Sequence, residues 1–214
     1  MPKVIIIIAI IGVLIFSYKS NYFNFPITEV EIISNGTKHD TSNFNKLIAN
    51  LQDKDLLSLD ITGIQKLIIT NEWIKDAEIN KSFPSKLQIK IIQHKPYAIF
   101  NSLILTEDGS IIKSSSEIAN LPIIIDNTNN AFISLNILRL SEKYLNKIGL
   151  GISKIEVFNS LIKIETSANI LISDRKNLEV NLVRLIDSYE GLKKLFKKDI
   201  KHIDMRYSNG FAIK

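Results

Sequence analysis

The C-terminal residues of the chain read Ile203-Asp204-Met205-Arg206-Tyr207-Ser208-Asn209-Gly210-Phe211-Ala212-Ile213-Lys214. Asn209-Gly210 stands between two runs that carry apolar residues, and Asn and Gly accept the positive φ that tight hairpin turns need. The stretch therefore predicts a C-terminal β-hairpin. Its last strand would have one paired edge and one free edge, whose N–H and C=O groups can pair with another chain. Simple closure of a sheet is the alternative reading.

The length of the turn decides which side chains of this hairpin face outward. A two-residue turn places three pairs opposite each other: Ser208 with Phe211, Tyr207 with Ala212, and Arg206 with Ile213. Met205 and Tyr207 would then face the core. Arg206, Phe211 and Ile213 would form an exposed patch on the other face. A three-residue turn would instead send Phe211 inward with Tyr207.

At the other end of the chain, residues 4–16 are apolar apart from one glycine. A helix over residues 4–18 would be about 22 Å long at about 1.5 Å per residue, against a hydrocarbon core of about 30 Å. A buried helix, a cleaved signal peptide and an uncleaved anchor are the alternatives. Residues 17–24 hold no small-x-small cleavage site and contain aromatic residues suited to the interface. We expect a cytoplasmic stub at 1–3 and a single transmembrane signal anchor at 4–23.

Residues 27–93 predict a first module. Apolar alternation predicts strands over 27–33, 73–83 and 86–93, and helical spacing predicts two short helices between the first two strands. The order is therefore βααββ. Lys95-Pro96 marks the end of the module, because proline restricts the preceding residue and cannot donate to a strand ladder.

A second module follows. Six strands are expected before the final hairpin, over 97–105, 110–113, 121–125, 152–158, 161–166 and 170–173. Helices are expected over 132–148 and 174–196, and Pro122 suits an edge strand. The sequence thus predicts an α+β protein: an N-terminal transmembrane helix, a βααββ domain over 24–95, and a mixed α/β domain over 96–214. The second domain would be built on a mainly antiparallel sheet with a C-terminal hairpin.

The composition and motifs indicate no catalytic chemistry. The chain has no cysteine, and His39, His94 and His202 fall in separate elements without a neighbouring ligand at metal-binding spacing. A formal net charge of +5 does not by itself argue for nucleic acid. We expect no enzyme activity, no metal site, no cofactor and no small-molecule substrate, and therefore a binding or scaffold role.

Several short motifs, in their order and spacing, resemble the FtsQ/DivIB family of bacterial cell-division proteins. The motifs are Glu72-Trp73-Ile74 with Ala77-Glu78-Ile79, Phe83-Pro84-Ser85-Lys86-Leu87-Gln88-Ile89, Gln93-His94-Lys95-Pro96-Tyr97-Ala98, Glu107-Asp108-Gly109, Leu121-Pro122, and Asp204-Met205-Arg206-Tyr207 with Gly210. Phe83 stands where the family favours Trp, and Gln93 where it favours Glu.

The resemblance implies a bitopic protein of the cell inner membrane, with a cytoplasmic N-terminus, a periplasmic POTRA domain over 24–95 and a β domain over 96–214. It implies a non-enzymatic scaffold at the division septum that recruits and docks the coiled-coil proteins FtsB and FtsL beside other divisome components. The docking edge would comprise Arg206, Tyr207, Ser208, Asn209, Gly210 and Phe211, to which the patch adds Ile213. A POTRA-containing module for membrane-protein or lipid transport is the alternative.

Overall fold

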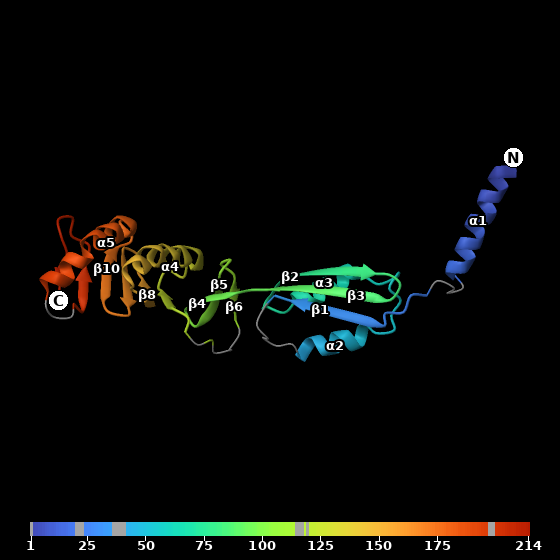
Figure 1. Cartoon of the computed structure of the whole chain (residues 1–214), viewed down its shortest axis with the longest axis horizontal. Helices are drawn as coiled ribbons and strands as arrows, with labels where there is room; N and C mark the ends of the chain where they lie inside the picture. The colour runs from blue at the N-terminus through green and yellow to red at the C-terminus, as the bar shows by residue number, and fades with distance from the viewer. Residues whose placement is uncertain (1, 20–23, 36–41, 114–117, 119, 197–199) are drawn as a thin grey trace. The chain divides into compact units, whose positions relative to one another are not determined.

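The computed structural model describes residues 2–19, 24–35, 42–113, 118, 120–196 and 200–214. The chain divides into two compact units, Met1–His94 and Lys95–Lys214 (Figure 1). Each unit has its own cluster of buried apolar side chains.

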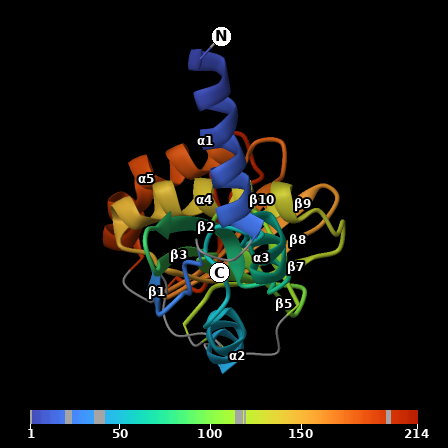
Figure 2. The same cartoon turned by 90° about the vertical axis from the view of Figure 1, so that its right-hand side faces the viewer.

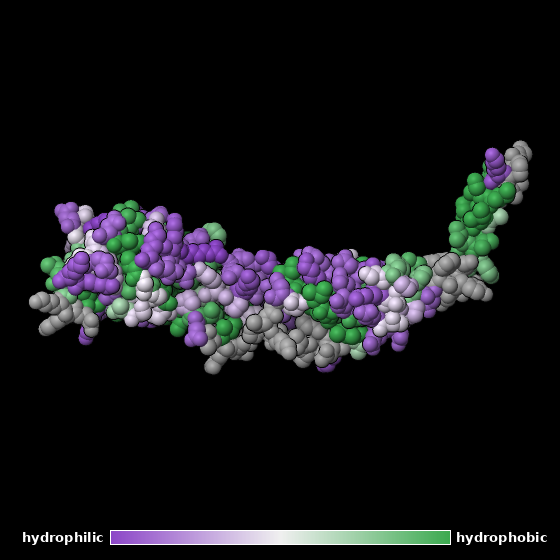
Figure 3. Space-filling view, in the orientation of Figure 1, coloured by the Kyte–Doolittle hydropathy of each residue, from purple (hydrophilic) through white to green (hydrophobic). Residues whose placement is uncertain are grey.

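The N-terminal helix α1 spans Pro2–Lys19. Its apolar side chains from Val4 to Phe16, where described, are 49–69% exposed, and Figure 3 shows them as a continuous apolar surface. Within the described part of the chain, no helix meets the combined length and hydropathy that a membrane crossing requires. The anchor expected over 4–23 is therefore not confirmed, and residues 20–23 of it lie outside the described residues.

The first unit has the βααββ order that the sequence predicts. Its elements are β1 (Glu29–Ser34), α2 (Ser42–Leu51), α3 (Ile61–Ile69), β2 (Ile74–Ser82) and β3 (Lys86–Gln93). The sheet order is β1-β3-β2, with β3 parallel to β1 and antiparallel to β2. Because β1 and β3 are parallel, a long crossover must connect them, and here it consists of α2, α3 and β2.

Strand β3 shows why this sheet has one buried and one solvated face. Leu87, Ile89 and Ile91 are buried in the core, together with residues of α2 and α3. Lys86 and Lys90 alternate with them, and their ammonium groups lie 2.9 and 3.1 Å from the carboxylates of Glu29 and Glu78. Because successive side chains of a strand point to opposite faces, the apolar residues of β3 face the helices and its lysines face water.

Within its described residues, the second unit has a nine-stranded sheet with two α-helices. Its elements are β4 (Pro96–Phe100), β5 (Leu103–Thr106), β6 (Ile111–Ile112), β7 (Ile123–Asp126), α4 (Ala131–Leu145), the 3₁₀ turn η1 (Asn146–Ile148), β8 (Ile152–Val157), β9 (Leu161–Thr166), β10 (Ile170–Asp174), α5 (Leu178–Leu195), β11 (His202–Asp204) and β12 (Ala212–Ile213). The sheet order is β12-β11-β10-β9-β8-β7-β4-β5-β6.

Most neighbours in this sheet are antiparallel, as expected; β10–β11, β7–β8 and β4–β7 are parallel. Figures 1 and 2 show α4 and α5 on the same face of the sheet. Their buried residues, among them Leu138, Leu182 and Leu185, join the inward residues of β8, β9 and β10 in one core. The opposite face carries a ladder of Lys154, Glu156, Lys163 and Glu165 across β8 and β9.

The expectation that Pro122 marks an edge strand is wrong. Strand β7 pairs with β4 on one side and with β8 on the other. The strand begins at Ile123, so the missing N–H of Pro122 falls outside the ladder, while its carbonyl accepts a hydrogen bond from the Ile99 N–H at 2.9 Å. Proline is therefore tolerated just before an internal strand.

Candidate functional site

The C-terminal stretch forms a hairpin, but with a wide loop in place of a tight turn. In β11 and β12, Ile203 lies opposite Ile213, and Asp204 lies opposite Ala212. Residues 205–211 therefore form the connection, which we call the docking loop. Neither a two-residue nor a three-residue turn at Asn209-Gly210 is adopted.

At the start of the loop, residue 205 pairs with the parallel strand β10. The Met205 N–H donates to the Ile172 carbonyl at 2.8 Å, and the Met205 side chain is fully buried. Residue 205 thus continues the pairing with β10 and is directed away from β12. This bond extends the ladder in which Ile172 lies opposite Asp204. The pairing with β12 has a different register from that of a two-residue turn at Asn209-Gly210, because Ile213 lies opposite Ile203 and not opposite Arg206.

The structure separates the residues that a tight turn would have grouped together. Tyr207 is 57% exposed, so the expectation that it faces the core beside Met205 is wrong. Arg206, Ser208 and Asn209 are also exposed in the docking loop. The expected patch of Arg206, Phe211 and Ile213 does not form, because Phe211 and Ile213 pack partly buried against the core.

Strand β12 is the last strand in the sheet order. His202 and Lys214 exchange both backbone bonds, with N–O distances of 3.0 and 3.1 Å. In an antiparallel ladder, bonded and non-bonded pairs alternate. Ile213 therefore directs its N–H and C=O away from β11, toward an edge where no other strand pairs within the described residues.

Arg206 is held by its own neighbour. Its Nε lies 2.9 Å from Asp204 Oδ1 and its Nη2 lies 2.6 Å from Oδ2, and the Arg206 backbone N–H also donates to Oδ1 at 3.1 Å. The hydrogen bonds from Arg206 hold the pKa of Asp204 below its usual value. The Asp204 carboxylate correspondingly raises the pKa of Arg206. Asp204 thus occupies the Nε and Nη2 donors of the Arg206 guanidinium.

The sequence reasoning missed Arg184, which reaches the docking loop from α5. Its Nη2 donates to the carbonyls of Tyr207 and Gly210 at 2.9 and 3.2 Å. Its guanidinium carbon lies 5.2 Å from the centre of the Phe211 ring. The residues are more than twenty positions apart in the chain, so no local pattern connects them.

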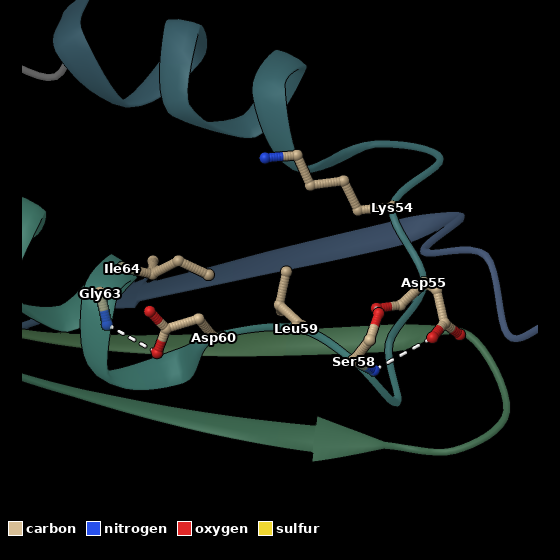
Figure 4. A pocket seen from close by; sticks show the side chains of 7 residues that line it. All are labelled: Lys54, Asp55, Ser58, Leu59, Asp60, Gly63 and Ile64. Atoms are coloured by element: carbon tan, nitrogen blue, oxygen red, sulfur yellow. Dashed lines mark hydrogen bonds between the residues drawn. The ribbon is translucent and has the colours of Figure 1, made fainter.

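Other polar clusters in the described chain have structural explanations. The hollow in Figure 4 is lined by Asp55 and Asp60, whose carboxylates already accept backbone N–H bonds from Ser58 and Gly63, both at 3.0 Å. Asp60 thereby caps α3, as polar residues before helices commonly do. Among the residues that the structure describes, no cluster of His, Cys, Asp and Glu is arranged to hold a metal ion.

The comparisons with known proteins agree with this architecture. Residues 25–94 match the family model of the POTRA domain, FtsQ-type. The chain is 25% identical to the cell division protein FtsQ of Cellvibrio japonicus over 174 residues, which cover 79% of this chain and 54% of that protein.

Two further relatives carry the same name. The FtsQ protein of Neisseria gonorrhoeae is 22% identical, with 94% of this chain and 84% of the relative covered. That of Haemophilus influenzae is 23% identical, with 88% and 77% covered. The family resemblance predicted from the short motifs is thereby confirmed.

Proposed function

We propose that this chain, which resembles the cell division proteins named FtsQ over most of its length and matches their type of POTRA domain, is a non-enzymatic divisome scaffold of the bacterial envelope. In this proposal it recruits FtsB-like and FtsL-like coiled-coil proteins to the division septum. The observation that carries the proposal is the free edge of β12, with the exposed docking loop beside it.

The proposed mode of binding is addition of a partner strand to β12. The outward N–H and C=O of Ile213 would supply backbone hydrogen bonds, which give affinity but little specificity for the partner's sequence. Strand β12 spans only Ala212–Ile213, so the ladder alone offers few bonds. Side chains of the docking loop must therefore contribute to recognition, and Tyr207 and Arg206 are its exposed large residues.

Arg206 has a specific part in this proposal. A partner carboxylate would take the guanidinium from Asp204 or share it through the remaining donors of the planar fork. Arginines that become desolvated at the centre of an interface are frequent hot spots. The same side chain left exposed beside Asp204 would contribute little, as surface ion pairs do.

The proposal also includes the membrane. Residues 4–23 would anchor the protein in the inner membrane, with the N-terminus cytoplasmic and the two domains, 24–95 and 96–214, periplasmic. The exposed apolar side chains of α1 support this part, since such a surface is unfavourable in water (Figure 3). N-terminal sequencing of the mature protein tests it, and a start near residues 20–25 would contradict it.

Localisation in dividing cells tests the function as a whole. A fluorescent fusion to the full chain should concentrate at midcell as constriction begins. A uniform envelope signal through the cell cycle would contradict a role in division. Calorimetry with the periplasmic segment of the FtsB-like protein then tests docking directly, and the variants described in the Discussion test where the partner binds.

A further inference from the structure

Arg184 is the only described side chain seen to bond to two separate backbone positions of the docking loop. Its Nη2 donates to the Tyr207 carbonyl at 2.9 Å and to the Gly210 carbonyl at 3.2 Å. Its guanidinium also lies over the ring of Phe211, 5.2 Å from the ring centre. One planar group thus joins the middle of the loop to the residue that leads into β12.

Arg184 is itself held by the core of the domain. Its Nη1 donates to Asn181 Oδ1 at 3.2 Å, one turn earlier on α5. Asn181 is 4% exposed and donates through Nδ2 to Ser173 Oγ at 3.0 Å, and Ser173 on β10 is fully buried. A chain of hydrogen bonds therefore runs from β10 through α5 to the loop.

The loop depends on such contacts for its shape. Ladder pairing between β11 and β12 stops at Asp204 and Ala212. The Met205 N–H bond to Ile172 and the Arg206–Asp204 pair act at the start of the loop. Within the described residues, Arg184 supplies the hydrogen bonds that join the later part of the loop, at Tyr207 and Gly210, to helix α5.

We propose that Arg184 is a positioning residue, which holds the docking loop in the shape that a partner strand on β12 recognises. This inference rests on the proposed function. A loop that is ordered before binding loses less conformational entropy when the partner docks. Without Arg184 the partner would have to order Tyr207 to Phe211 itself, and affinity would fall although Arg184 need not touch the partner.

The chemistry of arginine suits this role. The planar guanidinium can stack on a ring while its in-plane N–H groups reach the two carbonyls, a fixed geometry that the tetrahedral ammonium of lysine does not have. Arg184→Met keeps a flexible apolar stem against Phe211 but removes every donor. Arg184→Lys keeps the charge and only part of the geometry, so its effects should lie between those of wild type and Arg184→Met.

The chain offers a matched control at Arg139 on α4. Its Nη2 donates to the Glu107 carbonyl, and its guanidinium lies 5.6 Å from the centre of the Tyr97 ring. Arg139→Met therefore removes the same kinds of contact from the same domain. Its contacts are with β4 and the β5–β6 turn, far from β12 in the sheet order.

The experiment measures amide hydrogen exchange and partner binding on the full chain. Arg184→Met should speed exchange across Tyr207–Ala212 and weaken calorimetric binding of the FtsB-like periplasmic segment about tenfold, the factor that corresponds to 1.4 kcal/mol. Its melting temperature should fall no more than that of Arg139→Met, which should bind as wild type does.

Three results would count against the inference. Arg184→Met could bind as tightly as wild type, its loop exchange could be unchanged, or Arg139→Met could lose the same affinity through general destabilisation. A wild-type chain that fails to bind the segment overturns the proposed function instead. In that case, the rate of amide hydrogen exchange in the loop still shows whether Arg184 holds the loop in its shape.

Discussion

Asp204 and Arg206, two residues apart, form a two-point ion pair at the start of the docking loop, with Arg206 Nε and Nη2 at 2.9 and 2.6 Å from the two carboxylate oxygens. The pair lies at the point where β11 leaves the ladder with β12. Arg206, the arginine of the C-terminal motif, is therefore already engaged in an intramolecular ion pair. A partner carboxylate that binds Arg206 would therefore displace Asp204 or share the guanidinium with it.

Two substitutions at this pair should differ in their effect on binding. Arg206→Ala should weaken binding of the FtsB-like segment at least tenfold, as expected of a hot-spot arginine. Asp204→Asn removes the competing charge and should leave binding unchanged or stronger. Calorimetry measures both, and melting temperatures close to that of wild type show that the fold is intact. Equal affinity in wild type and Arg206→Ala would remove Arg206 from the docking site.

The two aromatic residues of the docking loop should behave differently. Tyr207 is 57% exposed, whereas Phe211 packs against the core beneath Arg184. Tyr207→Ala should weaken binding with little change in stability. Phe211→Ala should lower the free energy of unfolding by about 1–2 kcal/mol, less than the 3–5 kcal/mol of a fully buried Phe. Urea denaturation followed by calorimetry separates the effects, and a large stability loss in Tyr207→Ala would contradict the exposed position.

Proline substitutions along β12 should reveal which backbone groups the partner uses. The Ile213 N–H points to the free edge, so Ile213→Pro should weaken binding about tenfold or more with only a modest drop in melting temperature. Ala212 lies in a bonded position opposite Asp204, so Ala212→Pro should lower the melting temperature itself. Ile213→Ala controls for the lost side chain. Full affinity in Ile213→Pro would exclude strand addition at this edge.

Asp126 should be important for the stability of the second domain. Its carboxylate, 3% exposed, accepts bonds from the Thr128 and Asn130 N–H groups at 2.7 and 2.9 Å and from Ser134 Oγ at 2.8 Å. Asp126→Asn replaces an acceptor with a donor and should destabilise the domain by about 1–3 kcal/mol in urea denaturation. The exposed Asp187→Asn is the control and should have little effect.

The same carboxylate predicts a dependence on pH. Burial alone would raise the pKa of Asp126, but the bonds from Thr128, Asn130 and Ser134 together lower it below the usual value. A lowered pKa in the folded state adds stability above the unfolded pKa of about 4, and this stability is lost as pH falls through the folded pKa. The stability gap between wild type and Asp126→Asn should therefore narrow below about pH 4. A constant gap would show that the charge is unimportant.

Elements whose evidence is local could be predicted from the amino-acid sequence. The alternation of Leu87, Ile89 and Ile91 with Lys86 and Lys90 predicts β3 and its buried face, because a strand has a period of two. The spacing of apolar residues predicts the helices, and Asp60 predicts the start of α3. The motifs also predicted the family resemblance that the comparisons confirm.

The shape of the docking loop could not be predicted from local sequence, because it depends on contacts between distant segments. Asn209-Gly210 favours a tight turn, but Met205 is held by Ile172 on a parallel strand, and Tyr207 and Gly210 by Arg184 on a helix. These partners are 33, 23 and 26 residues away in sequence (205 − 172, 207 − 184, 210 − 184). Local sequence likewise did not predict that β7 is an internal strand, because its neighbours β4 and β8 are separate segments of the chain. Local sequence encodes the period of an element, whereas register and loop shape follow from hydrogen bonds between distant segments that form only in the folded domain.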